Sequence, residues 1–303
     1  MLVAGDVGGT KTLLAMFDGE LLRETSYPSA DFDSLEALLS EFIGHPVAAP
    51  ATLSLALAGP VRGDQAHVTN LDWPVDADSL RKRFGFERVR LTNDVAAIRQ
   101  AIPVLPGKSI VTLQAGEPDV SGTIAVVAPG TGLGFAADGI ASEGGSASFA
   151  PVTARQARLL GWMQERQGYV SREDVCSGRA MPDVRTFLRR NPEWCDEVES
   201  LDTPSIVASA LDGSSALSAA TLELWIEILG GIVGDWALEV AATGGIYLAG
   251  GLSARLLPVL QRPAFLTAFR EHGRMEAYLR RVPVQVVTEE RAALLGARLG
   301  GVE

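Results

Sequence analysis

The feature that most constrains this chain is its N-terminal stretch, where an apolar run ends in a carboxylate followed by a glycine pair. Residues 2–5 lead to Asp6, and donors follow it in order: Gly8, Gly9, Thr10, Lys11 and Thr12. Glycines let backbone N–H groups approach a bulky anion closely, and Asp6 is placed to hold a hydrated divalent metal. Phosphate, metal and carboxylate are the components of phosphoryl transfer. The alternative is a tight strand–turn–strand in which the glycines only make the turn.

Composition narrows the class of protein. The chain has 303 residues, enough for two domains, and its 47% hydrophobic and 21% charged residues are typical of a globular protein. A net charge of −11 argues against nucleic acid and anionic membrane surfaces as partners. We expect no transmembrane helix and no signal peptide. Cys176 and Cys195 lack metal-ligand spacing and indicate reduced thiols in a cytoplasmic protein.

Apolar periodicity and turn residues predict a mixed α/β pattern in the first third of the chain. A three-stranded meander comes first, over residues 2–25. Strands and helices then alternate, which favours a mixed sheet with helices on its faces. The later predicted elements are a helix at 31–43, a strand at 51–58, a loop from 59 through 74, a helix at 76–84, a strand at 89–92 and a helix at 95–101.

The segment 103–108, with its prolines and glycine, indicates the crossing into a second domain. The pattern partly restarts there, and residues 153–242 are predicted to be mainly helical. The long helix 217–241 contains Gly230 and Gly231, which we attribute to close helix packing. The other predicted elements are strands at 109–113, 123–128 and 245–249, a hairpin at 135–141, and a final strand and helix at 282–288 and 289–299.

Three predicted strands end in glycine loops. The first loop follows Asp6, the second carries Gly130, Thr131 and Gly132, and the third carries Gly250 and Gly251. A nucleotide held between two domains needs a backbone cradle from each side, so the three loops together favour a nucleotide-phosphate site. Structural turns at all three places are the alternative.

Asp94 is the second candidate for chemistry. It follows a predicted strand, stands beside Asn93 and begins a helix. One interpretation is a general base that accepts a hydroxyl proton as that oxygen attacks a γ-phosphate, with Asn93 as a ligand anchor. The other is that Asp94 is simply the N-cap of the helix.

Two glutamates are candidate acceptors for sugar hydroxyls. Glu143 lies among small residues and could accept two hydroxyls, although an exposed Glu in a surface loop is the alternative. Glu173 could be a second acceptor, or only part of a capping box or a solvated helix residue.

Taken together, these motifs resemble those of a bacterial glucokinase. The group in question belongs to the actin/hexokinase/heat-shock-protein superfamily and is distinct from the repressor-type sugar kinases. The resemblance covers essentially the whole chain. The matching stretches keep the family's order: Asp6-Val7-Gly8-Gly9-Thr10, Ala58-Gly59-Pro60 with Thr69-Asn70 and Trp73, Asn93-Asp94, Gly130-Thr131-Gly132-Leu133-Gly134, Glu143-Gly144-Gly145 with Phe149-Ala150-Pro151, Ser177-Gly178, and Ala249-Gly250-Gly251.

The resemblance implies two ribonuclease-H-like α/β domains with a central cleft for ATP. The small domain would hold residues 1–106 and the C-terminal helix, about 289–303, and the large domain residues 107–288. The family's catalytic base falls on Asp94, its sugar ligands on Asn93, Glu143 and Glu173, and Mg²⁺ near Asp6. The family is commonly homodimeric.

Two departures from the family's pattern stand near the expected sugar site. Ser146 and Ser148 replace a usual histidine and acidic residue, so Ser146 is a shorter, uncharged candidate ligand. The glycine-rich turn that usually follows Ser177-Gly178 is replaced by residues 179–182, which puts the geometry near Glu173 in question.

The leading hypothesis is therefore ATP-dependent phosphorylation of glucose at its 6-hydroxyl. A sugar-binding regulatory protein on a kinase scaffold is the alternative that the two serines suggest. A kinase for another hexose is a third, although the repressor-type relatives usually carry a zinc-binding cysteine cluster that this chain lacks. A chaperone-like ATPase would share the fold but would need a peptide-binding domain.

Overall fold

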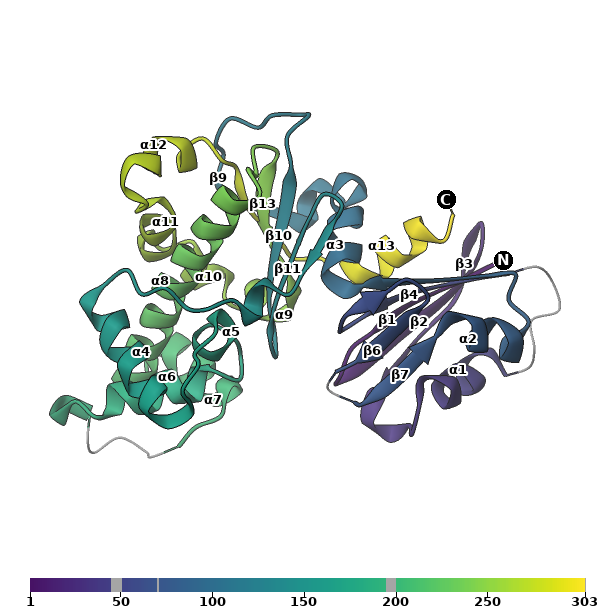
Figure 1. The fold of residues 1–303 in the computed structure, drawn as a ribbon, viewed down its shortest axis with the longest axis horizontal. Coiled ribbons are helices and arrows are strands. Elements are labelled where there is room, and N and C mark those ends of the chain that lie inside the picture. The colour runs from purple at the N-terminus through teal and green to yellow at the C-terminus, as the bar shows by residue number, and fades with distance from the viewer. Residues whose placement is uncertain (45–50, 70, 195–199, 303) are drawn as a thin grey trace. The chain divides into compact units, whose positions relative to one another are not determined.

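A computed structural model describes residues 1–44, 51–69, 71–194 and 200–302. The chain forms two compact units: Met1–Gly107 with Glu289–Glu303 is unit 1, and Lys108–Thr288 is unit 2 (Figure 1). Cys195 and Asn70, which the sequence analysis singles out, lie outside the described residues. Each unit is described separately below.

Unit 1 is built on a five-stranded mixed sheet. Its order is β3-β2-β1-β4-β8. β1, β4 and β8 run parallel, and β2 is antiparallel to both of its neighbours, β1 and β3. This confirms the predicted N-terminal meander. The strands are β1 (Leu2–Val7), β2 (Lys11–Asp18), β3 (Glu20–Pro28), β4 (Thr52–Leu57) and β8 (Arg88–Asn93).

The segment predicted as a loop after residue 58 contains a second, small antiparallel sheet, so that prediction is wrong. Its strands are β5 (Val61–Arg62), β6 (Gln65–Val68) and β7 (Trp73–Asp76), in the order β5-β6-β7. Strands of two to four residues show no usable alternation. Pro74 is tolerated because β7 is an edge strand, where a missing N–H donor leaves no ladder partner unpaired.

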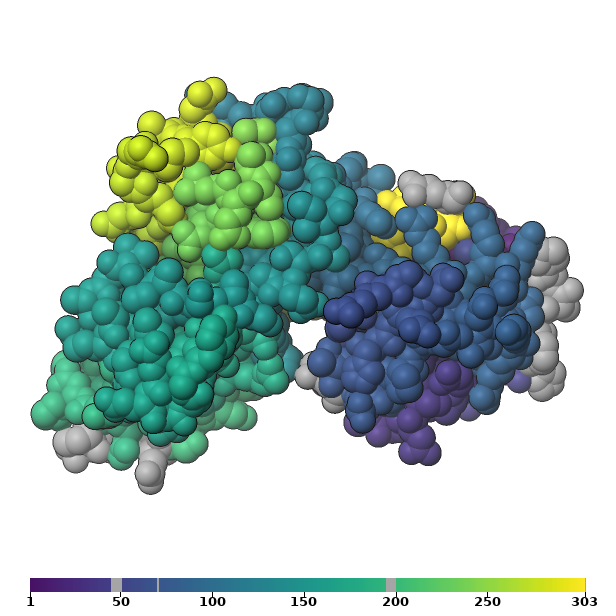
Figure 2. Space-filling view, in the orientation of Figure 1, coloured from purple at the N-terminus to yellow at the C-terminus, as the bar shows by residue number. Residues whose placement is uncertain are grey.

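Among the described residues, unit 1 has four α-helices, and a side chain caps the N-terminus of three of them. Ser34 caps α1 (Leu35–Ile43), which therefore starts later than predicted, and Asp76 caps α2 (Ala77–Phe84). α3 (Asp94–Ala101) follows β8 directly. The last helix, α13 (Ala292–Gly300), packs on α3, β1 and β4, and the C-terminal residues lie among those of the first unit (Figure 2).

Unit 2 contains a six-stranded sheet of order β12-β11-β10-β13-β14-β9. Its centre is parallel, because β10, β13 and β14 run in one direction. β11, β12 and β9 are antiparallel to their neighbours. The strands are β9 (Ile110–Gln114), β10 (Ile124–Pro129), β11 (Leu133–Ala137), β12 (Ile140–Ser142), β13 (Gly245–Leu248) and β14 (Val284–Val287).

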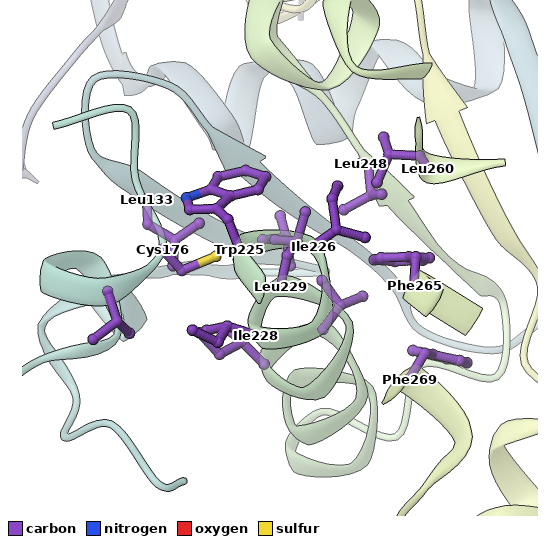
Figure 3. Close-up of a cluster of buried hydrophobic side chains, with 14 of the residues drawn as sticks. Leu133, Cys176, Trp225, Ile226, Ile228, Leu229, Leu248, Leu260, Phe265 and Phe269 are labelled. Carbon is purple, nitrogen blue, oxygen red and sulfur yellow. The ribbon is translucent and has the colours of Figure 1, made fainter. Parts of the chain in front are cut away.

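Unit 2 contains the long helix α8 (Ala216–Glu239), whose Trp225, Ile226 and Leu229 point into the core (Figure 3). Leu248, Phe265 and Cys176 lie in the same core. The other helices are α4 (Ala154–Gln167), α5 (Arg172–Val175), α6 (Met181–Arg189), α7 (Thr203–Leu211), α9 (Gly250–Arg255), α10 (Leu257–Leu260), α11 (Pro263–Arg270) and α12 (Glu276–Leu279).

Within the described residues, α8 alone is long and apolar enough to cross a membrane by length and composition. However, 67% of its most apolar window is buried inside the protein, as expected of a core helix. Burial likewise raises the pKa of the Cys176 thiol well above its usual value, which keeps that thiol protonated.

The two glycines within α8 have different surroundings. A Cβ on Gly230 would lie 2.9 Å from Ala268 Cβ of α11, so Gly230 permits the close α8–α11 contact. A Cβ on Gly231 would meet nothing within 4 Å. The prediction of close packing is therefore correct for Gly230 and wrong for Gly231.

Candidate functional site

In unit 1, three parallel strands end at one edge of the sheet and bring Asp6, Asn93 and Asp94 to it. The register pairs Asp6 with Ala56, and Leu57 with Asn93, so β1, β4 and β8 end together. The carboxyl ends of parallel strands are where α/β proteins place their ligands. The structure thus gathers at one sheet edge the residues that the sequence analysis selects from two distant segments.

Asn93 fixes the start of α3 and ties it to the neighbouring strand end. Its side-chain oxygen accepts hydrogen bonds from the N–H groups of Val95 at 3.0 Å and Ala96 at 3.1 Å. Its Nδ2 donates to the Gly59 carbonyl at 3.2 Å. Gly59 has φ +159°, and a Cβ there would collide with the His67 carbonyl, so no other residue fits. Asn93 is the N-cap, and the interpretation of Asp94 as the cap is wrong.

Asp94 is the first residue of α3, and its carboxylate stands at the helix N-terminus. One carboxylate oxygen accepts from the Val95 N–H at 2.8 Å. The partial positive charge of the helix N-terminus lies beside this carboxylate. Asp94 is half-buried, so a proton acceptor at this position is shielded from bulk water but not sealed from it.

Asp6 and Asp94 lie close enough to influence each other's charge. Burial, reinforced by the negative charge of Asp94 and offset in part by Lys11, raises the pKa of Asp6 to about 7. Two neighbouring carboxylates next to one ammonium group form a site that gains from a bound cation.

The turn between β1 and β2 holds its own shape. The Gly8 N–H donates to the Lys11 carbonyl at 3.0 Å, and the Gly8 carbonyl accepts from Ser29 Oγ at 2.7 Å. Thr12, suggested above as a phosphate donor, is buried, and its hydroxyl is 2.8 Å from that of Ser29. The prediction for Thr12 is therefore wrong. Gly9 is half-buried and Thr10 and Lys11 are exposed.

The donor set of unit 1 fits Mg²⁺ carried by a nucleotide better than a resident metal. Within the described ranges no group of three or more His, Cys, Asp or Glu side chains could hold a metal ion. Mg²⁺ at nucleotide sites keeps several waters and uses one or two protein carboxylates beside the substrate's phosphates. Asp6, with Asp94 as its charged neighbour, supplies that smaller set.

In unit 2, the other two glycine loops stand at neighbouring strand ends. β10 and β13 are parallel, and the Ala249 N–H donates to the Val127 carbonyl at 3.0 Å. Gly250 has φ +84°, and a Cβ there would lie 3.3 Å from the Pro129 carbonyl. Gly250 is thus required both by its backbone conformation and by the approach of the β10 loop.

The loop after β10 is closed by its own backbone. The Gly130 N–H donates to the Gly132 carbonyl at 2.9 Å, and the Gly130 carbonyl accepts from Gly178 N–H at 2.8 Å. Thr131 and Gly251 are exposed, and Gly130 and Gly132 are half-buried. These loops leave backbone at the surface of unit 2, as a phosphate cradle requires.

Glu173 is packed directly against this loop. Its Oε2 accepts from the Leu133 N–H at 2.9 Å, and a Cβ on Gly132 would lie 2.5 Å from the same oxygen. Glycine at 132 is therefore needed for the approach of the carboxylate. The capping box of α5 is made by Ser171 and Asp174, so Glu173 has no part in it.

The segment with Glu143 and Ser146 lies beside α5. Gly144–Ser146 forms a short 3-10 turn, and the Arg172 N–H donates to the Ala147 carbonyl at 2.8 Å. The side chains of Glu143 and Ser146, and of Ser148 after them, are exposed. The structure thus brings the Glu143 turn and the Glu173 helix together within unit 2.

Two residues at this place escape sequence reasoning. Tyr169 donates its hydroxyl to the Ser146 carbonyl at 2.8 Å. Arg179 pairs its guanidinium with Glu173. The sequence gives one signal for Arg179: it belongs to residues 179–182, which replace the family's glycine-rich turn. No local sequence pattern indicates that its side chain contacts Glu173.

The family model and the curated relatives agree on one family. The sequence model of the Glucokinase family matches residues 3–301. The curated glucokinase of Trichormus variabilis (strain ATCC 29413 / PCC 7937) is 33% identical, with 99% of this chain and 98% of that protein covered.

Solved structures agree in fold. A glucokinase from an Antarctic psychrotroph is 31% identical, with a TM-score of 0.83 over 99% of this chain and 98% of its own. A glucokinase from Balamuthia mandrillaris in complex with glucose is 21% identical, with a TM-score of 0.81 over 100% and 93%. At that identity the second likeness shows the fold alone.

Proposed function

The chain belongs to the glucokinase family, and from that premise we propose that it transfers the γ-phosphoryl group of ATP to the 6-hydroxyl of glucose. The observation that carries the proposal is the meeting of Asp6, Asn93 and Asp94 at the ends of three parallel strands. A proton acceptor and a metal-binding carboxylate on one rigid edge are what phosphoryl transfer to a hydroxyl needs.

Asp94 is the proposed general base. It accepts the proton of the sugar hydroxyl while that oxygen attacks the γ-phosphorus and the bond to the β-phosphate oxygen breaks, releasing ADP. Asn93 holds the turn rigidly through α3 and Gly59, so that Asp94 keeps its orientation. Asn93 is also proposed to contact the sugar.

The nucleotide is proposed to bind through backbone and small side chains. Gly8, Gly9, Thr10 and Lys11 of unit 1 offer N–H, hydroxyl and ammonium donors to phosphate oxygens. In unit 2 that role falls to the loops with residues 130–132 and 250–251. Mg²⁺ bound at Asp6 would neutralise charge that develops on the phosphate oxygens.

The sugar is proposed to bind through Glu143, Ser146 and Glu173. A carboxylate has about four acceptor sites on its two oxygens and can accept two vicinal hydroxyls. Glu173 already accepts the Leu133 N–H through one oxygen, which fixes the carboxylate and leaves acceptor capacity for a hydroxyl. A cytoplasmic homodimer remains a further expectation.

A hexose panel tests this proposal. The purified chain is incubated with Mg²⁺ and ATP, and ADP production is followed with glucose, mannose, fructose, glucosamine and N-acetylglucosamine. We expect the highest kcat/KM with glucose. A higher value with another sugar would mean that Ser146 and Ser148 retune the pocket. Tight sugar binding without turnover would instead indicate a regulatory protein.

A further inference from the structure

The carboxylate of Glu173 is held by two donors, one on each oxygen. Leu133 N–H donates to Oε2 at 2.9 Å, and Arg179 Nη2 donates to Oε1. A glutamate has three rotatable side-chain bonds, so a carboxylate with a single donor would still sample several positions. The second donor removes that freedom.

Four hydrogen bonds hold the backbone of residues 177–179 in place. The Gly178 N–H donates to the Gly130 carbonyl at 2.8 Å, and the Arg179 N–H to the Thr131 carbonyl at 3.4 Å. The Ser177 carbonyl accepts from Trp225 Nε1 at 3.2 Å, and the Gly178 carbonyl accepts from Thr203 Oγ1. These bonds anchor the backbone at Arg179 to α8, to α7 and to the loop of residues 130–132.

We propose that Arg179 is a positioning residue for Glu173, which sets the affinity of the site for its neutral sugar. This inference rests on the proposed function, in which Glu173 accepts sugar hydroxyls. Arg179 holds one oxygen of Glu173 in place and balances its charge, while the remaining lone pairs face the ligand. It acts on the sugar only through the carboxylate.

The exposure of the pair sets the size of the effect. The side chain of Glu173 is 30% exposed and that of Arg179 is 61% exposed. Ion pairs in such surroundings contribute modestly, so loss of Arg179 is expected to weaken glucose binding about two- to fivefold.

The test uses Arg179→Met, which keeps most of the apolar stem and removes the charge. Glucose Kd is measured by calorimetry, and kcat and both KM values by ADP production. We expect glucose Kd and KM to rise about two- to fivefold, with kcat and the KM for ATP unchanged. Arg281→Met is the matched control, since it breaks an exposed pair with Glu117 elsewhere in unit 2, and it should change none of these values.

A second variant separates positioning from other roles. In a Glu173→Gln background, which keeps an acceptor for Leu133, the Arg179→Met change should have no further effect on glucose affinity. The inference is overturned if glucose affinity does not respond to Arg179→Met, if the effect persists in the Gln background, or if the KM for ATP rises instead.

Failure of the proposed function would give a different experimental result from failure of the positioning role. In that case the wild-type chain itself would produce no ADP with glucose, whereas calorimetry would still report on Arg179. If the wild-type chain also binds no glucose, Glu173 holds no such sugar and the positioning role is overturned as well.

Discussion

At the residue scale, the site separates two jobs that adjacent side chains of similar chemistry could each perform. Asn93 caps α3 and donates to the Gly59 carbonyl, whereas the carboxylate of Asp94 lies at the helix N-terminus, where we propose that it acts as the base. Both residue types are good N-caps, so the sequence alone does not decide which of them begins the helix.

Ser146 is the residue that should tune the sugar affinity. Its backbone N–H donates to the Glu143 carbonyl at 2.9 Å and its carbonyl accepts from Tyr169, while its side chain is exposed. A larger side chain can therefore replace it without moving the turn. We expect Ser146→His, the residue usual in the family, to lower the KM for glucose about threefold to tenfold, the equivalent of one added hydrogen bond.

Steady-state kinetics with glucose as the varied substrate check this prediction. Ser146→Ala is the matched comparison and should raise the KM for glucose about threefold to tenfold, because it removes the hydroxyl that is proposed to bind the sugar. A histidine variant whose KM for glucose equals that of the wild type would show that position 146 does not face the sugar.

At the scale of elements, the two consecutive glycines of α8 are expected to affect the stability of unit 2 in opposite ways. A Cβ on Gly230 would press on Ala268 of α11, whereas a Cβ on Gly231 would meet nothing. We expect Gly230→Ala to lower the free energy of unfolding of unit 2 by about 1–3 kcal/mol through overpacking. Gly231→Ala should raise it by about 0.5–1 kcal/mol, because alanine restricts the unfolded chain.

Hydrogen exchange of the α8 amides measures both variants in the intact chain. The two substitutions differ by one position and are identical in chemistry, so each serves as the control for the other. Equal destabilisation by both would mean that packing around α8 is not what distinguishes them.

The helices and strands also show which parts of the structure can be predicted from the sequence. Strands that end in glycine loops, and helices with a clear cap, follow from local residue chemistry, as at Asp6 and Asp76. The β5–β7 sheet could not be predicted, because its strands are short and one of them contains Pro74. The Arg179–Glu173 pair depends on tertiary folding that no window of sequence contains.

At the scale of the whole molecule, the chain returns to its first unit at its end. α13 packs on α3, Arg90 Nη1 donates to the Gly300 carbonyl at 2.9 Å, and Arg298 lies 4.3 Å from the centre of the Phe17 ring. The final helix therefore contributes to the stability of the unit that carries Asp6 and Asp94.

Gly296 lets α13 pack closely on α3, because a Cβ there would collide with the Ala97 carbonyl of α3. We expect Gly296→Ala to lower the free energy of unfolding of unit 1 by about 1–3 kcal/mol and to leave unit 2 unchanged. Hydrogen exchange resolved by unit measures this. Gly161→Ala, at a helical glycine with open space around it, is the control and should not destabilise. Exchange that accelerates equally in both units would contradict the prediction.

The central claim is that Asp94 removes the proton from a sugar hydroxyl, and Asp94→Asn tests it most directly. ADP production with saturating glucose, Mg²⁺ and ATP is compared for the wild type, Asp94→Asn and Asp78→Asn, an exposed aspartate that pairs only with Arg81 in the described structure. We expect kcat to fall about 10²- to 10⁴-fold for Asp94→Asn, with glucose still bound, and to stay unchanged for Asp78→Asn. An Asp94→Asn variant that keeps more than about a hundredth of the wild-type kcat would contradict the account, because general-base catalysis typically contributes about 10²- to 10⁴-fold.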